Sequence, residues 1–186
     1  MENSIATLPM GTKVIVVSRN PLDACVSAYY HAWNPAKSGW PFSAWAAAWL
    51  SGNVPHGSWF DWVRRWHGQS QLYPDRVLWL QYEDLKHSSS ETVKRIADFI
   101  GVESDPELIR LAVEKSSFDS MCEQAQQKGG DKLSHLRKGV AGDWCNHFSE
   151  ELAEDFFTYY REQLSGTGII FSLGGEGAEE RFLSAP

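Results

Sequence analysis

The feature that most constrains the fold is a short β-branched run at residues 13–18, KVIVVS, which leads directly into Arg19-Asn20-Pro21. Continuous valine and isoleucine without polar alternation is typical of strands that are buried on both faces of a parallel sheet. Asn20 is a favourable N-cap residue, and Pro21 suits the first position of a helix. The sequence therefore predicts a strand at 13–18, a tight turn and a helix that ends near His31.

A second run of the same kind, VLWLQY at residues 77–82, predicts a second buried strand. Strands separated by helical segments favour an α/β fold with a parallel sheet flanked by helices. Two strands are few for such a sheet, so we expect part of the fold to be missing upstream. The other expected elements are a helix opened by Pro41, a helix capped by Ser58, a helix with a Ser88-x-x-Glu91 capping box and a stop at Gly101, a helix begun by Asp105-Pro106, a polar loop at 121–135, a helix at 149–164 and a flexible tail at 173–186.

Charge and cysteine content narrow the class of protein. The 17 Lys and Arg residues against 24 Asp and Glu give a formal net charge of −7, and an acidic chain is a poor nucleic-acid binder because that affinity comes from cations. Three cysteines without a close pair fit a reducing compartment. The start of the chain has no signal-peptide pattern, and the longest apolar stretch, 44–50, is far shorter than the about 20 residues of a membrane span. We expect a cytoplasmic protein with one domain at 1–172 and no nucleic-acid or membrane partner.

Arg19 and Ser27 form the first candidate site. In open α/β sheets, ligands lie at the carboxyl ends of strands, where helix N-termini present free N–H groups to anions. Arg19 occupies such an end and has a guanidinium suited to a phosphate, while Ser27 follows about two helical turns later. The alternative is that Arg19 pairs with Asp23 and Ser27 is a small packing residue. Both interpretations stay open at this point.

The second candidate site is Arg137-Lys138-Gly139, where two adjacent cations precede a glycine that lets a phosphate approach the backbone. The window from residue 128 to residue 138 holds four Lys and Arg residues against Asp131, within an acidic chain. A local field opposite to the global charge concentrates anions. The alternative is a solvated loop, which would not need this order of residues.

A third and weaker candidate is Ser116-Ser117-Phe118. An aromatic ring can stack on a nucleobase while neighbouring hydroxyls hydrogen-bond to its edge. Residues this common occur together by chance, so the segment carries little weight alone.

Together these segments resemble the cytosolic sulfotransferase family. KVIVVSRNPLDACVSAYYH is similar to the 3′-phosphate-binding segment of that family, and LRKGVAGDWCNHF is similar to its RKGxxGDW signature. GNVPHGSWFDWV, VLWLQYEDLK and KSSFDSM fall between them and resemble the intervening blocks. The resemblance covers residues 13–171. It implies a P-loop nucleotide-kinase-like sulfotransferase fold that is N-terminally truncated here, with 1–172 a partial sulfotransferase domain.

The resemblance also implies a ligand and its contacts. The sulfuryl donor would be 3′-phosphoadenosine 5′-phosphosulfate (PAPS), the product 3′-phosphoadenosine 5′-phosphate (PAP), and the acceptor a small-molecule phenol, alcohol or amine, with no metal. Arg19 and Ser27 would hold the 3′-phosphate, and Arg137, Lys138 and the Gly139 backbone would close on it. The residues implied for the adenine side are Tyr82, Ser116, Ser117, Phe118 and Met121.

Departures from the family pattern limit the expected activity. The family's 5′-phosphosulfate loop with its lysine, and its catalytic histidine, lie upstream of the 3′-phosphate segment, so we expect no catalytic residue here and an inactive chain on its own. His31 is a poor substitute for that base, and Ala32 stands where many members carry an aromatic. The family dimer motif is degraded, with Cys145, Ser149, Glu150 and Glu154 at its spaced positions, which leaves the oligomeric state open. The alternative function is a non-catalytic PAP- or PAPS-binding or interaction module derived from a sulfotransferase.

Overall fold

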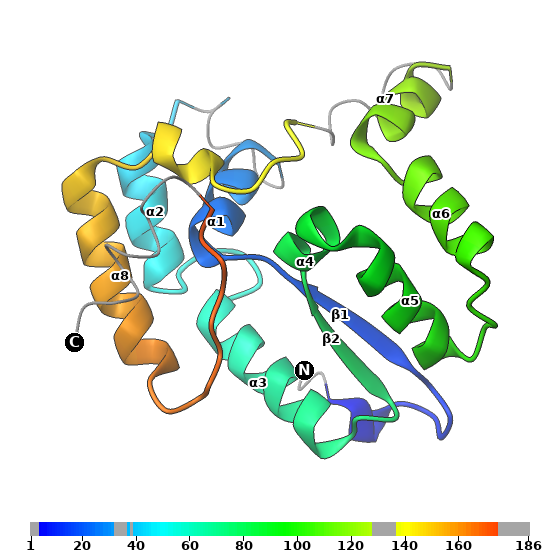
Figure 1. Ribbon diagram of the computed structural model, residues 1–186. Coiled ribbons are helices and arrows are strands. Elements are labelled where there is room, and N and C mark those ends of the chain that lie inside the picture. Colours follow the sequence, from blue (N-terminus) through cyan, green and yellow to red (C-terminus); the bar gives the residue numbers. More distant parts are fainter. Residues whose placement is uncertain (1–3, 32–36, 38, 128–136, 175–186) are drawn as a thin grey trace.

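The computed structural model describes residues 4–31, 37, 39–127 and 137–174. Two parallel strands, β1 (Val14–Ser18) and β2 (Val77–Gln81), form its sheet, paired in register from Val14 with Val77 to Ser18 with Gln81 (Figure 1). Both predicted strands are confirmed. Tyr82 does not end the second strand as expected, because it is the first residue of helix α4 (Tyr82–His87).

Helix α1 (Pro21–Tyr30) begins as the sequence predicts. The Asn20 side chain accepts a hydrogen bond from the backbone N–H of Asp23, and Pro21 takes the first position, where its missing N–H costs nothing. This cap turns the chain directly from β1 into α1. The carboxyl end of β1 therefore lies beside the N-terminus of a helix.

The other predicted helices are also present. Ser58, Asp105 and Ser149 each accept a backbone N–H at the start of the helix that follows, as expected of N-cap residues. Gly101 ends α5 in the left-handed conformation, with φ +83°. These helices are α2 (Phe42–Leu50), α3 (Trp59–Leu72), α5 (Ser89–Ile100), α6 (Pro106–Lys115) and α8 (Glu150–Leu164), together with the short 3₁₀ turns η1 (Ile5–Thr7) and η3 (Asp143–Asn146).

Besides the end of the second strand, two other predictions about local structure are wrong. Ser88 precedes α5 but makes no side-chain capping bond, because it also ends α4, its N–H donating to the Asp84 carbonyl. The expected loop at 121–135 is helical at its start, within α7 (Phe118–Gln127). The Ser117 hydroxyl accepts the N–H of Ser120, and this contact begins α7 despite its polar sequence. The rest of that loop, 128–135, lies outside the described residues.

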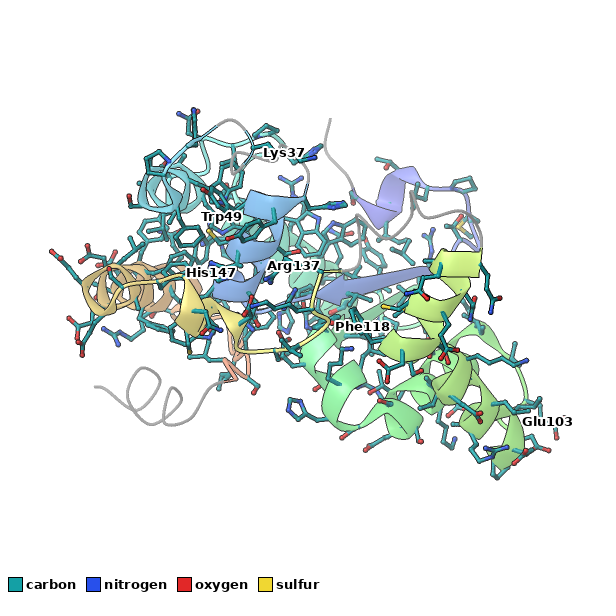
Figure 2. All side chains as sticks on the ribbon, turned by 90° about the horizontal axis from the view of Figure 1, so that it is seen from above. Lys37, Trp49, Glu103, Phe118, Arg137 and His147 are labelled. Carbon is teal, nitrogen blue, oxygen red and sulfur yellow. The ribbon has the colours of Figure 1, made fainter. Side chains whose placement is uncertain are left out.

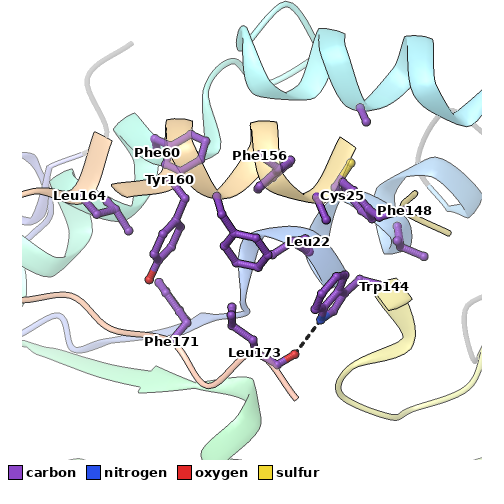
Figure 3. Packing of buried hydrophobic residues seen from close by; sticks show 14 of the residues in the cluster. Leu22, Cys25, Phe60, Trp144, Phe148, Phe156, Tyr160, Leu164, Phe171 and Leu173 are labelled. Carbon is purple, nitrogen blue, oxygen red and sulfur yellow. Dashed lines mark hydrogen bonds between the residues drawn. The ribbon is translucent and has the colours of Figure 1, made fainter. Parts of the chain in front are cut away.

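The main hydrophobic core lies on one side of the sheet, among α1, α2, α3, α8 and the segment that follows α8 (Figure 3). Phe60, Phe156 and Phe171 are fully buried there. The Trp144 indole N–H donates to the Leu173 carbonyl at 2.9 Å. Leu173, the first residue of the expected tail, is itself fully buried, and residues 175–186 lie outside the described part of the chain.

Candidate functional site

A cavity of about 580 Å³ opens at the carboxyl ends of the two strands, between α4, α5, the α6–α7 junction and the loop that precedes η3. All ten candidate residues line it, although they come from four separate parts of the sequence. Figure 2 shows Arg137 between Phe118, on the cavity side, and His147. The lining residues are Arg19, Ser27, Tyr82, Leu85, Lys86, Ser89, Val93, Val113, Ser116, Ser117, Phe118, Met121, Arg137, Lys138 and Gly139.

Arg19 makes the ion pair that the alternative interpretation expected, and this pair does not withdraw it from the cavity. Its guanidinium pairs with Asp23 at 3.3 Å and also lines the cavity. It donates to the Val140 carbonyl at 2.7 Å and lies 4.7 Å from the centre of the Tyr82 ring. Its Nε is buried without a hydrogen-bond partner among the described residues. The carboxylate therefore fixes the orientation of the arginine while donor capacity remains.

Asp23 joins the two motifs that lie farthest apart in the sequence. Its fully buried carboxylate accepts the backbone N–H of Gly142 at 2.7 Å and that of Trp144 at 3.0 Å. It also accepts an N–H of the Asn20 side chain at 3.0 Å. A buried carboxylate needs several donors to offset its desolvation. Asp23 therefore holds the RKGxxGDW loop against the N-terminus of α1.

The two cations of that loop share one buried carboxylate, Asp143. Arg137 pairs with its Oδ2, and Lys138 donates to its Oδ1 at 2.6 Å. His147 Nε2 lies 3.2 Å from Oδ2, and Asn146 donates to Oδ1 at 3.0 Å. Burial opposes ionisation of Asp143, but the hydrogen bonds from Lys138 and Arg137 outweigh it and hold its pKa well below the usual range. The carboxylate stays ionised and holds both cations at the cavity wall.

Position 139 requires a glycine for two reasons, the conformation of its backbone and the lack of room for a side chain. Its φ is +66°, in the left-handed region that favours glycine. A Cβ built at this position would overlap the Phe118 ring. The absence of a side chain therefore brings the backbone of the cationic loop against an aromatic side chain from α7.

Two aromatic rings line the cavity, and beside them lies a cation that sequence reasoning missed. The Nζ of Lys86 lies 5.4 Å from the centre of the Tyr82 ring and 5.9 Å from that of Phe118. The hydroxyls of Ser116 and Ser117 also lie here, and each already has a helix-end partner, the first donating to the Ala112 carbonyl at 2.7 Å.

Sequence reasoning missed five lining residues, and two of them, Leu85 and Lys86, lie in α4, which it did not predict. Tyr82 and Lys86 are four residues apart, so the helix places them on one face. Assigning α4 would have revealed that signal. The other three, Ser89, Val93 and Val113, come from α5 and α6, where the local sequence does not indicate contact with a ligand.

The cavity is positively charged although the chain is acidic. Four of the described lining residues are Lys or Arg, and none of those described is Asp or Glu. Glu83 lies just outside the lining and is fully buried, with its Oε1 accepting the backbone N–H and side-chain amide of Asn20, both at 2.9 Å. Burial raises the pKa of the Glu83 carboxyl, and the bonds from Asn20 offset part of this rise.

The described residues offer neither a metal site nor a membrane-spanning helix. No cluster of three or more His, Cys, Asp or Glu side chains there is arranged to hold a metal ion. No helix in the same part of the chain has the length and apolarity to span a membrane. Residues Ala32, Lys128, Asp131 and Lys132, which entered the sequence predictions, lie outside the described ranges.

The fold and the cavity together define an α/β protein with a cation-lined cavity at the carboxyl ends of parallel strands, the place where open α/β sheets bind their ligands. A family model described as "Sulfotransferase domain" matches residues 5–168 of the 186. The chain therefore belongs to the sulfotransferase family and has its α/β fold, and the resemblance drawn from the motifs is confirmed.

Individual relatives agree with this assignment. Sulfotransferase 2A6 of Rattus norvegicus is 40% identical over 114 residues, which are 60% of this chain and 39% of that protein. Sulfotransferase 2A1 of Homo sapiens is 36% identical over 140 residues, 69% of this chain and 48% of that protein. The chain thus spans less than half the length of these two relatives.

Solved structures give the same fold. Mouse sulfotransferase SULT7A1, in a crystal structure complexed with PAP, superposes with a TM-score of 0.76 at 27% identity, over 90% of this chain and 65% of that one. Retinol dehydratase in complex with androsterone and the inactive cofactor PAP has a TM-score of 0.76 at 22% identity, over 90% and 53%. At that identity the second likeness supports the fold alone.

Proposed function

We propose that this chain carries the 3′-phosphate and adenine half of the donor site of a PAPS-dependent sulfotransferase. Arg19, Ser27, Arg137 and Lys138 bind the 3′-phosphate with the Gly139 backbone. The residues that bind the adenine side are Tyr82, Ser116, Ser117, Phe118 and Met121. In the complete enzyme, the sulfuryl group passes from PAPS to a hydroxyl or amine of a small-molecule acceptor.

The observation that carries this proposal is the convergence of all ten candidate residues on one cavity with four cations and, among its described lining, no acid. A 3′-phosphate needs a preorganised set of cations and donors. Asp23 and Asp143 hold three of those cations in place before any ligand arrives. The PAP complex of SULT7A1, a relative with the same fold, supports the choice of nucleotide.

A second candidate, a PAP-binding module without turnover, is favoured by the absence of histidine among the described lining residues. His31, the nearest candidate in the sequence, is the C-cap of α1 and does not line the cavity. We therefore expect residues 1–186 alone to show negligible transfer of labelled sulfate from PAPS to a phenol. Measurable turnover by this chain would contradict that expectation and favour a complete active site.

A thermal-shift titration tests the binding proposal. PAP at one hundred times its dissociation constant stabilises a binding-competent chain by about 2.7 kcal/mol, which raises the Tm by several degrees. AMP, which lacks the 3′-phosphate, should produce a much smaller shift. Arg137→Ala should abolish the PAP shift, while Arg110→Ala, on the exposed face of α6, should retain it. No shift with PAP in the unaltered chain would overturn the proposed function.

A further inference from the structure

Lys86 differs from the other cations of the cavity because no carboxylate pairs with it among the described residues. The arginine at the end of β1 pairs with Asp23, and the two cations of the loop share Asp143. These pairs fix the geometry of three positive groups but also neutralise part of their charge. Lys86 therefore contributes a full positive charge to the cavity wall.

Lys86 also lies beside two aromatic rings of the cavity. Its Nζ lies within 6 Å of the rings of Tyr82 and Phe118, at 5.4 and 5.9 Å from their centres, a distance at which a cation interacts with an aromatic face. The lining residues of α4, α5 and α6 also include the apolar Leu85, Val93 and Val113. The cavity thus combines two rings, apolar side chains and one cation that has no carboxylate partner among the described residues, while Arg19, which contacts the same Tyr82 ring at 4.7 Å, is paired with Asp23.

Such a combination suits a nucleobase better than a phosphate. A base has aromatic faces that stack on rings, and edge nitrogens that accept hydrogen bonds from an ammonium group. A phosphate would gain from the charge but would lose hydration against the apolar wall. Lys86 is exposed when the cavity is empty, so its cation–π contacts are weak until a ligand displaces water.

We propose that Lys86 is a specificity-determining binding residue that selects ligands carrying a base over ligands carrying only phosphates. The inference rests on the proposed nucleotide-binding function and adds a residue to that site. Lys86 strengthens binding of the base, while the paired cations hold the phosphate. Removing its charge should weaken a nucleotide and leave its base-free counterpart almost unchanged.

The experiment compares two ligands by calorimetry on the full chain at physiological ionic strength, where charges beyond about 8 Å are largely screened. The ligands are PAP and 1-deoxyribose 3,5-bisphosphate, which has the same phosphates and no base. Lys86→Met keeps the length of the side chain and removes its charge. We expect its Kd for PAP to rise about fivefold, as for the loss of one hydrogen bond to the base of about 1 kcal/mol, and its Kd for the base-free ligand to change less than twofold.

Two further variants distinguish a loss of ligand binding from a loss of folding. Lys86→Arg retains a planar cation near both rings and should restore most of the PAP affinity. Lys94→Met makes the same chemical change on the exposed face of α5 and should leave both ligands unaffected. Equal weakening of both ligands, or of neither, in Lys86→Met would overturn the proposal. An unaltered chain that binds the base-free ligand as tightly as PAP would overturn the role of Lys86 alone, whereas one that binds neither would overturn the proposed function as well.

Discussion

Single buried side chains determine how the cavity is built. Asp143 holds two cations at the wall, and Asp23 ties the cationic loop to the first helix. Removing either carboxylate would leave buried donors and cations without a partner, which costs more than the net value of the contacts themselves. Gly139 and Glu83 also influence the site as single residues, and a substitution at each of them tests that influence.

Gly139→Ala should impair both stability and binding. An L-residue in the left-handed region costs about 1–2 kcal/mol, and the new Cβ would also displace the Phe118 ring. Gly101→Ala is the matched control, because Gly101 has φ +83° and nothing within 4 Å of its Cβ position. Both variants should lose stability by urea denaturation, and Gly139→Ala should lose more because of the Phe118 ring, but PAP binding should fall about tenfold or more in the Gly139 variant alone. Equal PAP affinity in the two variants would show that the contact with Phe118 does not matter for the ligand.

Glu83→Gln tests the effect of the buried carboxyl on pH dependence. Because burial raises the pKa of Glu83 in the folded protein above its ordinary 4.5, ionising it is harder in the folded than in the unfolded chain. The free energy of unfolding should therefore decline as pH rises above about 4.5, until the folded-state pKa is passed. Glutamine cannot ionise, so the variant should gain stability relative to the parent as pH rises to neutrality.

Urea denaturation at a series of pH values from about 4.5 to neutral measures this difference. The control is Glu91→Gln, which replaces an exposed carboxyl at the start of α5. The difference in the free energy of unfolding between this variant and the parent should vary much less over that pH range. A constant stability difference between Glu83→Gln and the parent would mean that Glu83 does not titrate as its burial implies.

At the scale of elements, a side-chain capping bond shows which of the predicted N-cap residues stabilise a helix start. Ser149 accepts the Leu152 N–H at 3.2 Å at the start of α8, whereas Ser88 precedes α5 without such a bond. Ser149→Ala should therefore cost about 1 kcal/mol of stability, and Ser88→Ala only a few tenths. Chemical denaturation of both variants checks this, and an equal loss in the two would contradict the assigned difference in capping.

An element could be predicted from the sequence when the residues that stabilise it are close to one another along the chain. α1, α3 and α8 have a cap residue followed by apolar residues at helical spacing, so nearby residues alone identify them. α4 and α7 lack that pattern, and α4 follows β2 without any intervening turn residue. Both were missed or misplaced because their helical state is supported by contacts with other elements, such as the packing of α4 on α5 and of α7 on α6.

At the scale of the whole molecule, the sheet leaves apolar surface uncovered. Ile15 and Val17 of β1 are 39% and 45% exposed, although strands of parallel sheets are normally covered on both faces. Within the described residues, β1 pairs with β2 alone. Exposed β-branched residues on a strand that has one edge without a neighbouring strand favour association between chains.

We therefore expect this chain to associate as its concentration rises, as measured by size-exclusion chromatography with light scattering. Val17→Lys should shift the population towards monomer, because a charge on the strand opposes pairing. Leu108→Lys, which alters a 58% exposed leucine on α6, should leave the association unchanged. A sharp monomer peak for the unaltered chain at high concentration would contradict the expectation.

The sequence by itself, read together with the family resemblance, identified the two strands, most helix starts, the family and ten of the fifteen residues described as lining the cavity. It could do so because caps, β-branched runs and the motifs RKGxxGDW and SRNPxD act over a few neighbouring residues. Only the tertiary structure decided that Arg19 both pairs with Asp23 and lines the cavity, that Asp143 is shared, and that Lys86 lies by Phe118. These contacts join residues whose distance in space depends on how the elements pack, and no local propensity encodes that distance.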